Sequence, residues 1–154
     1  MKITALEEYG LRCMLQLAAG RPGESFTVAE IARREGLSGA YVEKLLRILG
    51  KAGLAQSLRG VKGGYTLARP SEQITLGDVG RALGGIQLPH EICHRYTGKQ
   101  KTCVHEDGCS IRPVWHDVTR YVMEMMDSIP ISRLLNRADL VQLSADQSRP
   151  PAAV

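Results

Sequence analysis

The sequence of 154 residues predicts a mainly α-helical fold with one small β-hairpin. In most of the chain, apolar residues recur every three or four positions, which is the spacing of one face of a helix. Two short β-prone runs flank a turn that holds three glycines within five residues, from Gly60 to Gly64. One further segment has neither a helical nor a strand period, and it carries three of the four cysteines.

Capping residues and glycines mark the first helices. A helix is expected over residues 4–19, because a glycine and a proline follow it. Thr27 followed by Glu30 is the sequence of a capping box, which predicts a short second helix over residues 28–34. Gly36 then stands where glycine commonly ends a helix.

Ser38 is expected to cap a third helix over residues 39–52. Two short helices joined by a glycine-containing turn have the form of a helix-turn-helix, whose second helix lies in the major groove of DNA. The candidates for base and phosphate contact in this region are Ser38, Tyr41, Lys44 and Arg47.

Residues 54–58 and 65–68 are predicted to form the two strands of the hairpin. The glycines between the strands are expected to supply the positive φ angles of a tight turn. Arg59 and Lys62 flank these glycines, so the hairpin is a wing with a charged tip. We expect both cations at a minor groove, where narrow A·T tracts concentrate negative potential. The predicted winged helix-turn-helix domain spans residues 1–85.

Two segments follow the wing. Thr75 and Asp78 form another capping box, which predicts a helix through Leu83. Residues 86–110 then form the cysteine-bearing loop, and a loop of this length without regular structure is usually functional or disordered.

Residues 111–143 are predicted to be the dimerisation region. A long helix is expected over residues 111–127, capped by Ser110, and a short helix should follow it. The broad apolar stripe of the long helix needs a partner surface, which a two-fold contact with a second copy would supply. Trp115 is expected to be a packing anchor beneath the cysteine loop. Residues 144–154 are predicted to be a disordered tail.

The net charge of +4 is unevenly distributed. Residues 1–85 hold 12 basic and 8 acidic side chains, whereas residues 86–154 hold 8 of each. This asymmetry suggests a polyanionic partner for the first domain, although a solvated basic surface would have the same charge. The sequence lacks an apolar run of membrane-spanning length and a signal peptide, so a cytoplasmic location without a membrane partner is expected.

Clustered cysteines in that compartment favour metal or redox chemistry over disulfides. Cys93, Cys103 and Cys109 with His94 or His105 would make a four-ligand zinc centre. The same thiolates are the usual ligands of iron–sulfur clusters, and free thiols are a third interpretation. The spacing alone favours neither metal. The fourth cysteine, in the first helix, is expected to be a small core residue.

Four stretches of the sequence resemble one known family. They are the opening Met-Lys-Ile-Thr, the segment Tyr41–Leu46, the wing Arg59–Tyr65, and Cys109 shortly before Trp115. Over about residues 1–140 the chain resembles the Rrf2 family of bacterial winged-helix regulators. The resemblance implies a homodimer, crossed through its long C-terminal helices, that binds double-stranded operator DNA.

In many members of this family, three cysteines hold an iron–sulfur cluster, either 2Fe–2S or 4Fe–4S. The resemblance therefore favours a cluster on the three loop cysteines, with zinc as the less favoured metal. The histidine ligand of IscR-like members would fall at Arg112, which cannot bind metal. NsrR-like members use an acidic residue of the first helix, reaching across the dimer, and Glu8 stands at that position. His94 and His105 are rival ligands, and Glu8 could instead simply pair with Arg12 four residues on.

The expected function is a transcriptional regulator, repressor or activator, that senses redox, nitric oxide or iron–sulfur status. An enzyme with a small-molecule substrate is not expected, because no Ser/His/Asp set, nucleophile elbow or paired-carboxylate motif is present. One alternative is a metal-free regulator of the same fold that responds to a thiol state or a partner. Another is a small iron–sulfur carrier, which the basic winged domain disfavours.

Overall fold

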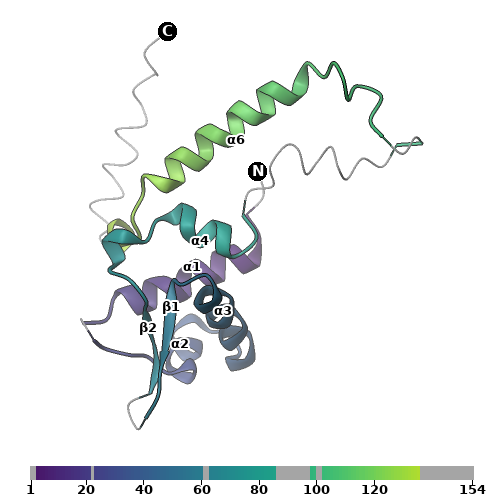
Figure 1. Ribbon diagram of the computed structural model, residues 1–154. Coiled ribbons are helices and arrows are strands. Elements are labelled where there is room, and N and C mark those ends of the chain that lie inside the picture. Colours follow the sequence, from purple (N-terminus) through teal and green to yellow (C-terminus); the bar gives the residue numbers. More distant parts are fainter. Residues whose placement is uncertain (1–2, 22, 61–62, 86–97, 100–101, 136–154) are drawn as a thin grey trace.

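The structure is a computed structural model that describes residues 3–21, 23–60, 63–85, 98–99 and 102–135 (Figure 1). Some of the predictions lie outside the described residues. They concern Lys62, Cys93, His94, residues 86–97 of the predicted cysteine loop, the end of the predicted last helix and the tail over residues 144–154.

Three helices form the first layer of the fold: α1 (Ala5–Ala18), α2 (Val28–Glu35) and α3 (Gly39–Lys51). Their ends lie within one residue of the predicted ends. Each begins at a side chain that accepts a backbone N–H: α2 at Thr27, in a capping box with Glu30, and α3 at Ser38. These caps work within four residues of sequence, which is why the pattern alone located them. Gly36 ends α2 with a φ of 66°, as predicted.

The hairpin consists of β1 (Ala55–Leu58) and β2 (Gly64–Leu67), paired antiparallel. Strand β2 also bridges to the segment before α2, because Phe26 and Tyr65 exchange two backbone hydrogen bonds of 2.9 and 2.8 Å. The wing is therefore attached to the start of the helix-turn-helix as well as to the end of α3.

The prediction that all three wing glycines supply positive φ is wrong for two of them. Only Gly60 has a positive φ, of 112°. A Cβ at Gly63 would lie 2.8 Å from the carbonyl oxygens of Leu58 and Gly60, and a Cβ at Gly64 would lie 2.7 Å from that of Phe26. These two positions lack a side chain because backbone passes too close to them, not because of their own torsion angles.

A single apolar core joins these elements. Helix α4 (Leu76–Ala82) closes one side of it, starting at the predicted capping box of Thr75 and Asp78. In α1, Gly10 lets the two helices meet, because a Cβ there would overlap the buried side chain of Leu83. The largest fully buried side chains are Met14, Ile31, Leu45, Leu46, Leu49, Leu54, Ile74 and Ile131.

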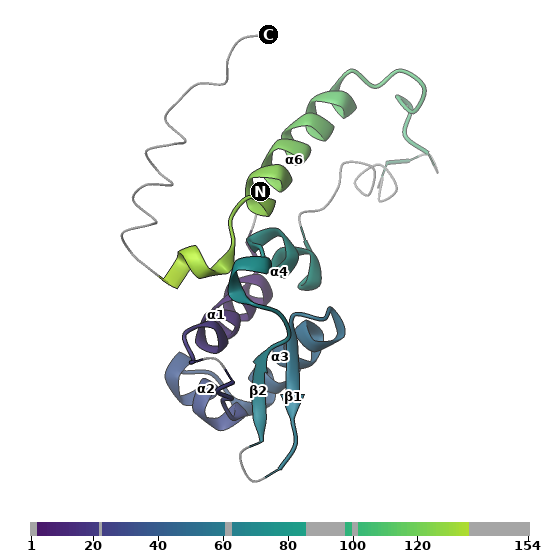
Figure 2. The same ribbon diagram turned by 60° about the vertical axis from the view of Figure 1, so that its left-hand side comes forward.

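Helix α6 (Ile111–Asp127) leads away from this core, and its C-terminal end is fixed to it (Figures 1 and 2). Leu76 donates to the carbonyl of Ile129, and Ile131 donates to that of Ile74, both at 2.8 Å. The short 3-10 helices η1 (Ser71–Gln73) and η2 (Ile131–Leu135) flank this pairing. The last predicted helix is thus a 3-10 turn over its described part.

Ser110 does not cap α6 as predicted. Its backbone is already helical, with φ −71° and ψ −19°, and its side chain makes no cap hydrogen bond. A capping side chain needs an extended backbone to fold back on the first turn, as at Ser38. None of the helices in the described part of the chain is long and apolar enough to cross a membrane.

Candidate nucleic-acid interface and cysteine loop

The exposed face of α3 carries the candidate DNA-contacting cations. Val42, Leu45, Leu46 and Leu49 bury one side of the helix, which leaves Lys44 and Arg47 exposed on the other. Ser38 accepts the N–H of Tyr41 at 3.3 Å, so its hydroxyl already has a structural role.

Tyr41 is half-buried rather than free on the surface. Its ring packs edge to face against Tyr9 of α1, with centroids 6.1 Å apart and an interplanar angle of 81°. Arg12 in turn lies over the ring of Tyr9, 5.9 Å from its centroid. The start of α3 is therefore in contact with the surface of α1, a link that the sequence pattern did not reveal because it joins residues far apart in the chain.

Arg59 is exposed at the end of β1, on the wing. Figures 1 and 2 both show α3 and the wing at one end of the molecule and α6 at the other. The cationic side chains that are candidates for DNA contact therefore lie on one side of the molecule, away from the turn with Cys103 and Cys109. Their individual contacts with DNA stay predictions, and Lys62 belongs to the undescribed tip.

A short turn connects two of the loop cysteines. Cys103 and Cys109 carry free, half-buried thiols. The carbonyl of Cys103 accepts the N–H of Glu106 at 3.1 Å, and the carbonyl of His105 accepts the N–H of Gly108 at 3.3 Å. Within the described residues, no three metal-binding side chains come together, and Cys93 lies outside that range.

Arg112 holds this turn from the first turn of α6. Its Nη2 donates to the carbonyl oxygen of Glu106 at 3.1 Å. Its Nε is buried and has no acceptor within the described part of the chain. Sequence reasoning treated Arg112 only as a residue that cannot bind metal, and its position one helical turn from Cys109 was the signal for this second role.

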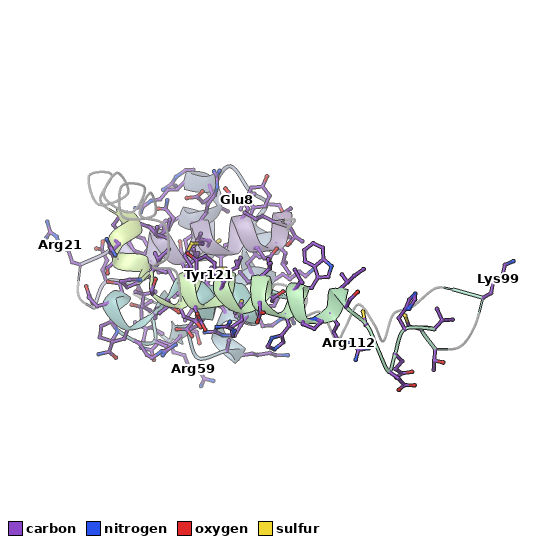
Figure 3. All side chains as sticks on the ribbon, turned by 90° about the horizontal axis from the view of Figure 1, so that it is seen from above. Glu8, Arg21, Arg59, Lys99, Arg112 and Tyr121 are labelled. Atoms are coloured by element: carbon purple, nitrogen blue, oxygen red, sulfur yellow. The ribbon has the colours of Figure 1, made fainter. Side chains whose placement is uncertain are left out.

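Glu8 lies on α1, apart from Arg112 at the start of α6 (Figure 3). Its carboxylate accepts from Nε of Arg12 at 2.8 Å, four residues on, and both side chains are about half exposed. The local pairing considered for Glu8 is therefore present, and its role as a metal ligand from a second copy stays a prediction.

The predicted core role of Cys13 is confirmed. Its side chain is fully buried in α1. Burial, with a smaller contribution from the charge of Glu35, raises the pKa of the Cys13 thiol to about 12. A thiol with such a pKa stays protonated at neutral pH, and the thiolate is the form that binds metals and reacts.

One face of α6 is apolar and exposed from Ile111 to Tyr121. Ile111, Val114, Trp115, Val118 and Tyr121 (labelled in Figure 3) are each 47–64% exposed. The expectation that Trp115 is buried beneath the loop is wrong for the single chain, in which 54% of it is exposed. Its neighbours on the same face indicate why: the whole stripe lacks a covering surface within the described residues.

A helix-turn-helix with a cationic outer face and a basic wing defines a DNA-binding protein of the winged-helix class. Comparison with known proteins identifies the family. The chain belongs to the Rrf2 family, described as iron-dependent transcriptional regulators, whose model matches residues 3–137.

Known relatives agree with this assignment. The protein rrf2 of Nitratidesulfovibrio vulgaris is 32% identical over 152 residues, 99% of each chain. The regulator IscR of Yersinia enterocolitica is 28% identical over 96% of this chain and 87% of its own.

Two solved structures are similar throughout. One is CymR, the global cysteine regulator of B. subtilis, with a TM-score of 0.70, 32% identity, and coverage of 88% of this chain and 96% of that one. The other is IscR of T. potens, with a TM-score of 0.67, 29% identity, and coverage of 99% and 94%. The fold class, the DNA-binding transcriptional role and the assignment to regulators rather than enzymes are thereby confirmed.

The burial of Cys13 predicts its reactivity. In folded protein from which any bound metal has been removed, iodoacetamide at pH 7.5 should modify Cys103 and Cys109 and leave Cys13 unmodified, because Cys13 is both inaccessible and protonated. Peptide mass spectrometry before and after addition of denaturant measures this, and Cys13 should react only in the unfolded chain. Native modification of Cys13 at the rate of Cys103 would contradict its placement in the core.

Proposed function

We propose that this regulator is a homodimer that binds operator DNA and senses redox, nitric oxide or iron–sulfur status through a cluster held by Cys93, Cys103 and Cys109. One observation carries the proposal: the turn with Cys103 and Cys109 runs directly into α6, whose other end is fixed to the DNA-binding unit. A change at the cysteines therefore has a rigid element along which to act.

The donor set suits an iron–sulfur centre. Two free thiols lie at the ends of one short turn, and thiolates are the usual ligands of such clusters. The buried Nε of Arg112, which has no acceptor among the described residues, puts a cationic donor beside this turn, and such a donor suits an anionic occupant. When bound, an iron–sulfur cluster supplies redox chemistry whose potential depends on nearby charge and hydrogen bonds.

Glu8 is the proposed fourth ligand, from the second copy. Its present partner is Arg12, and an exposed pair of this kind contributes little to stability, so Glu8 can leave it at small cost. Arg12 lies over Tyr9, which packs against Tyr41 at the start of α3. A change of partner by Glu8 would therefore alter side chains that touch the proposed recognition helix.

The apolar stripe of α6 supports the homodimer. A contiguous exposed stripe on one helix is typical of an interaction surface. A second copy of the same helix is its simplest cover, since a two-fold contact pairs the same surface on both subunits. Such a dimer would present two copies of α3 to successive major grooves.

A metal-free regulator that responds to thiol oxidation is the second candidate. The likeness to CymR, a cysteine regulator whose Staphylococcus aureus form is known in an oxidised state, favours it. The half-buried thiols of Cys103 and Cys109 would serve either function. An iron–sulfur carrier has no comparable support, because the family is one of DNA-binding regulators.

For DNA binding, Arg47→Ala and Arg59→Ala should each weaken operator affinity roughly ten- to a hundredfold, the effect of losing a charged hydrogen bond. Each lost phosphate contact should make the negative slope of log affinity against log salt shallower by about one unit. Titrations of a duplex selected by the wild-type protein, at several salt concentrations, measure both. Lys44→Ala, Tyr41→Phe and Lys62→Ala extend the series, whereas Ser38→Ala also removes the cap of α3.

Arg120→Ala is the matched control, because Arg120 pairs with Asp117 and Glu124 on α6, away from the wing. It should leave affinity and salt slope unchanged. If Arg47→Ala behaves like this control on every sequence, the assignment of α3 as the recognition helix is wrong.

For the sensor, protein purified without oxygen should contain iron and acid-labile sulfide and absorb visible light. Cys93→Ser, Cys103→Ser and Cys109→Ser should each abolish the colour, because each removes a thiolate ligand. Cys13→Ala should retain it, since Cys13 is buried elsewhere. Glu8→Ala should retain iron but change the Mössbauer spectrum.

Zinc without sulfide would refute the cluster, and colourless protein whose DNA affinity follows thiol oxidation would support the metal-free candidate instead. A silent Glu8→Ala, together with a changed spectrum for His94→Ala or His105→Ala, would place the fourth ligand within the loop.

A further inference from the structure

The C-terminal end of α6 is joined to the base of the wing by four charged side chains, here called the hinge network. Asp127, the last residue of α6, accepts from Nη1 of Arg81 at 2.7 Å. Nη2 of Arg81 lies 3.0 Å from Oδ1 of Asp78, on the same helix α4. Oδ2 of Asp78 lies 3.6 Å from Nη2 of Arg69, which closely follows β2.

Steric contacts keep this junction tight. A Cβ at Gly77 would overlap Oδ1 of Asp127, so glycine is what allows the carboxylate to lie against α4. One turn later, a Cβ at Gly80 would lie 3.0 Å from Cε of Met126. The last turn of α6 is thus seated on two side-chain-free positions of α4.

The local chemistry of α6 does not explain Asp127. A negative side chain at the C-terminus of a helix is disfavoured, because the helix dipole is also negative there. Arg81 offsets this charge from another element. Asp127 therefore belongs to the junction rather than to the helix.

Asp78, at the centre of the network, is ionised at neutral pH. Burial alone would raise the pKa of Asp78, but the backbone N–H of Thr75 and the guanidinium of Arg81 outweigh it and lower that pKa. Because its members are partly exposed, such pairs add little to global stability. These pairs matter instead for the direction of the α6 axis. They contact α6 at Asp127, a point separate from the backbone pairing of Ile129–Ile131, and two separate contacts constrain the orientation of a helix.

We propose that the hinge network sets the direction in which α6 leaves the DNA-binding unit. In the dimer of the proposed function, on which this consequence rests, that direction determines the spacing of the two copies of α3. A helix rises 1.5 Å per residue, so the 17 residues of α6 span about 25 Å, and a tilt of about 10° moves the far end by about 4 Å. Such a displacement is close to the rise of one base pair, about 3.4 Å, so it would change the half-site spacing that the dimer fits.

Asp127→Ala tests this proposal, because it breaks the link between α4 and α6 and leaves the Arg81–Asp78 pair intact. Asp117→Ala is the matched control: Asp117 also pairs with an arginine, Arg120 at 3.4 Å, but within α6 itself. Spin-labelled amino acids are placed at the exposed positions Gln56 and His116. Pulsed electron paramagnetic resonance then measures the distance between the wing and α6 within one chain, because dilution with unlabelled chains suppresses distances between subunits.

Wild type and Asp117→Ala should give the same narrow distance distribution, and Asp127→Ala a broader one or one shifted by several ångströms. Melting temperatures of all three should stay close. An unchanged distribution in Asp127→Ala overturns the proposal, whether or not the protein binds DNA or a cluster.

A separate measurement tests whether the hinge network sets the spacing between the two copies of α3 on DNA. A duplex selected by the wild-type protein is compared with versions whose half-site spacing is one base pair longer or shorter. Asp127→Ala should reduce the preference for the native spacing at least threefold, and Asp117→Ala should keep it. An intact spacing preference in Asp127→Ala overturns the link to half-site geometry. A wild-type protein that selects no duplex refutes the proposed function, and the distance comparison still decides the role of the network.

Discussion

The backbone pairing between Ile74–Leu76 and Ile129–Ile131 is the interaction on which the two halves of this protein depend. It makes a segment that follows α6 part of the core, where Ile74 and Ile131 are fully buried. It adds a backbone link to the side-chain contacts that α6 makes with α4. With it, α6 has one end at the cysteine turn and the other on the element that follows the wing.

In the proposed function, this arrangement would let one small chain combine DNA recognition and sensing. The cations of α3 and the wing lie at one end, and the turn with Cys103 and Cys109 lies beyond the other (Figure 1). One route between them is α6 with its junction on α4. In the proposed dimer, α1, where Arg12 and Tyr9 contact Tyr41, would be a second route. A ligand at the sensor affects DNA binding only by its differential affinity for two arrangements of such elements.

The features predicted from sequence are those set by near neighbours in the chain. The capping box of Thr27, the glycine end of α2 and the ends of α1 and α3 each depend on a few consecutive residues, and they were predicted to within one residue. Two other features depend on residues far apart in the chain. Gly64 is required by the distant carbonyl of Phe26, and Asp127 is explained by Arg81, so neither has a local signal. The exposed Trp115 differs again, because no surface within the described residues covers it.

The central claim is that the state of the cysteine loop controls DNA binding through α1 and α6. Operator affinity of anaerobic, cluster-loaded protein and of the same protein after cluster removal, each for wild type and Glu8→Ala, tests it most directly. We predict that cluster removal changes wild-type affinity about tenfold or more, a coupling of about 1.4 kcal/mol or above, and that Glu8→Ala loses most of this change. Equal wild-type affinity in the two states would contradict the account.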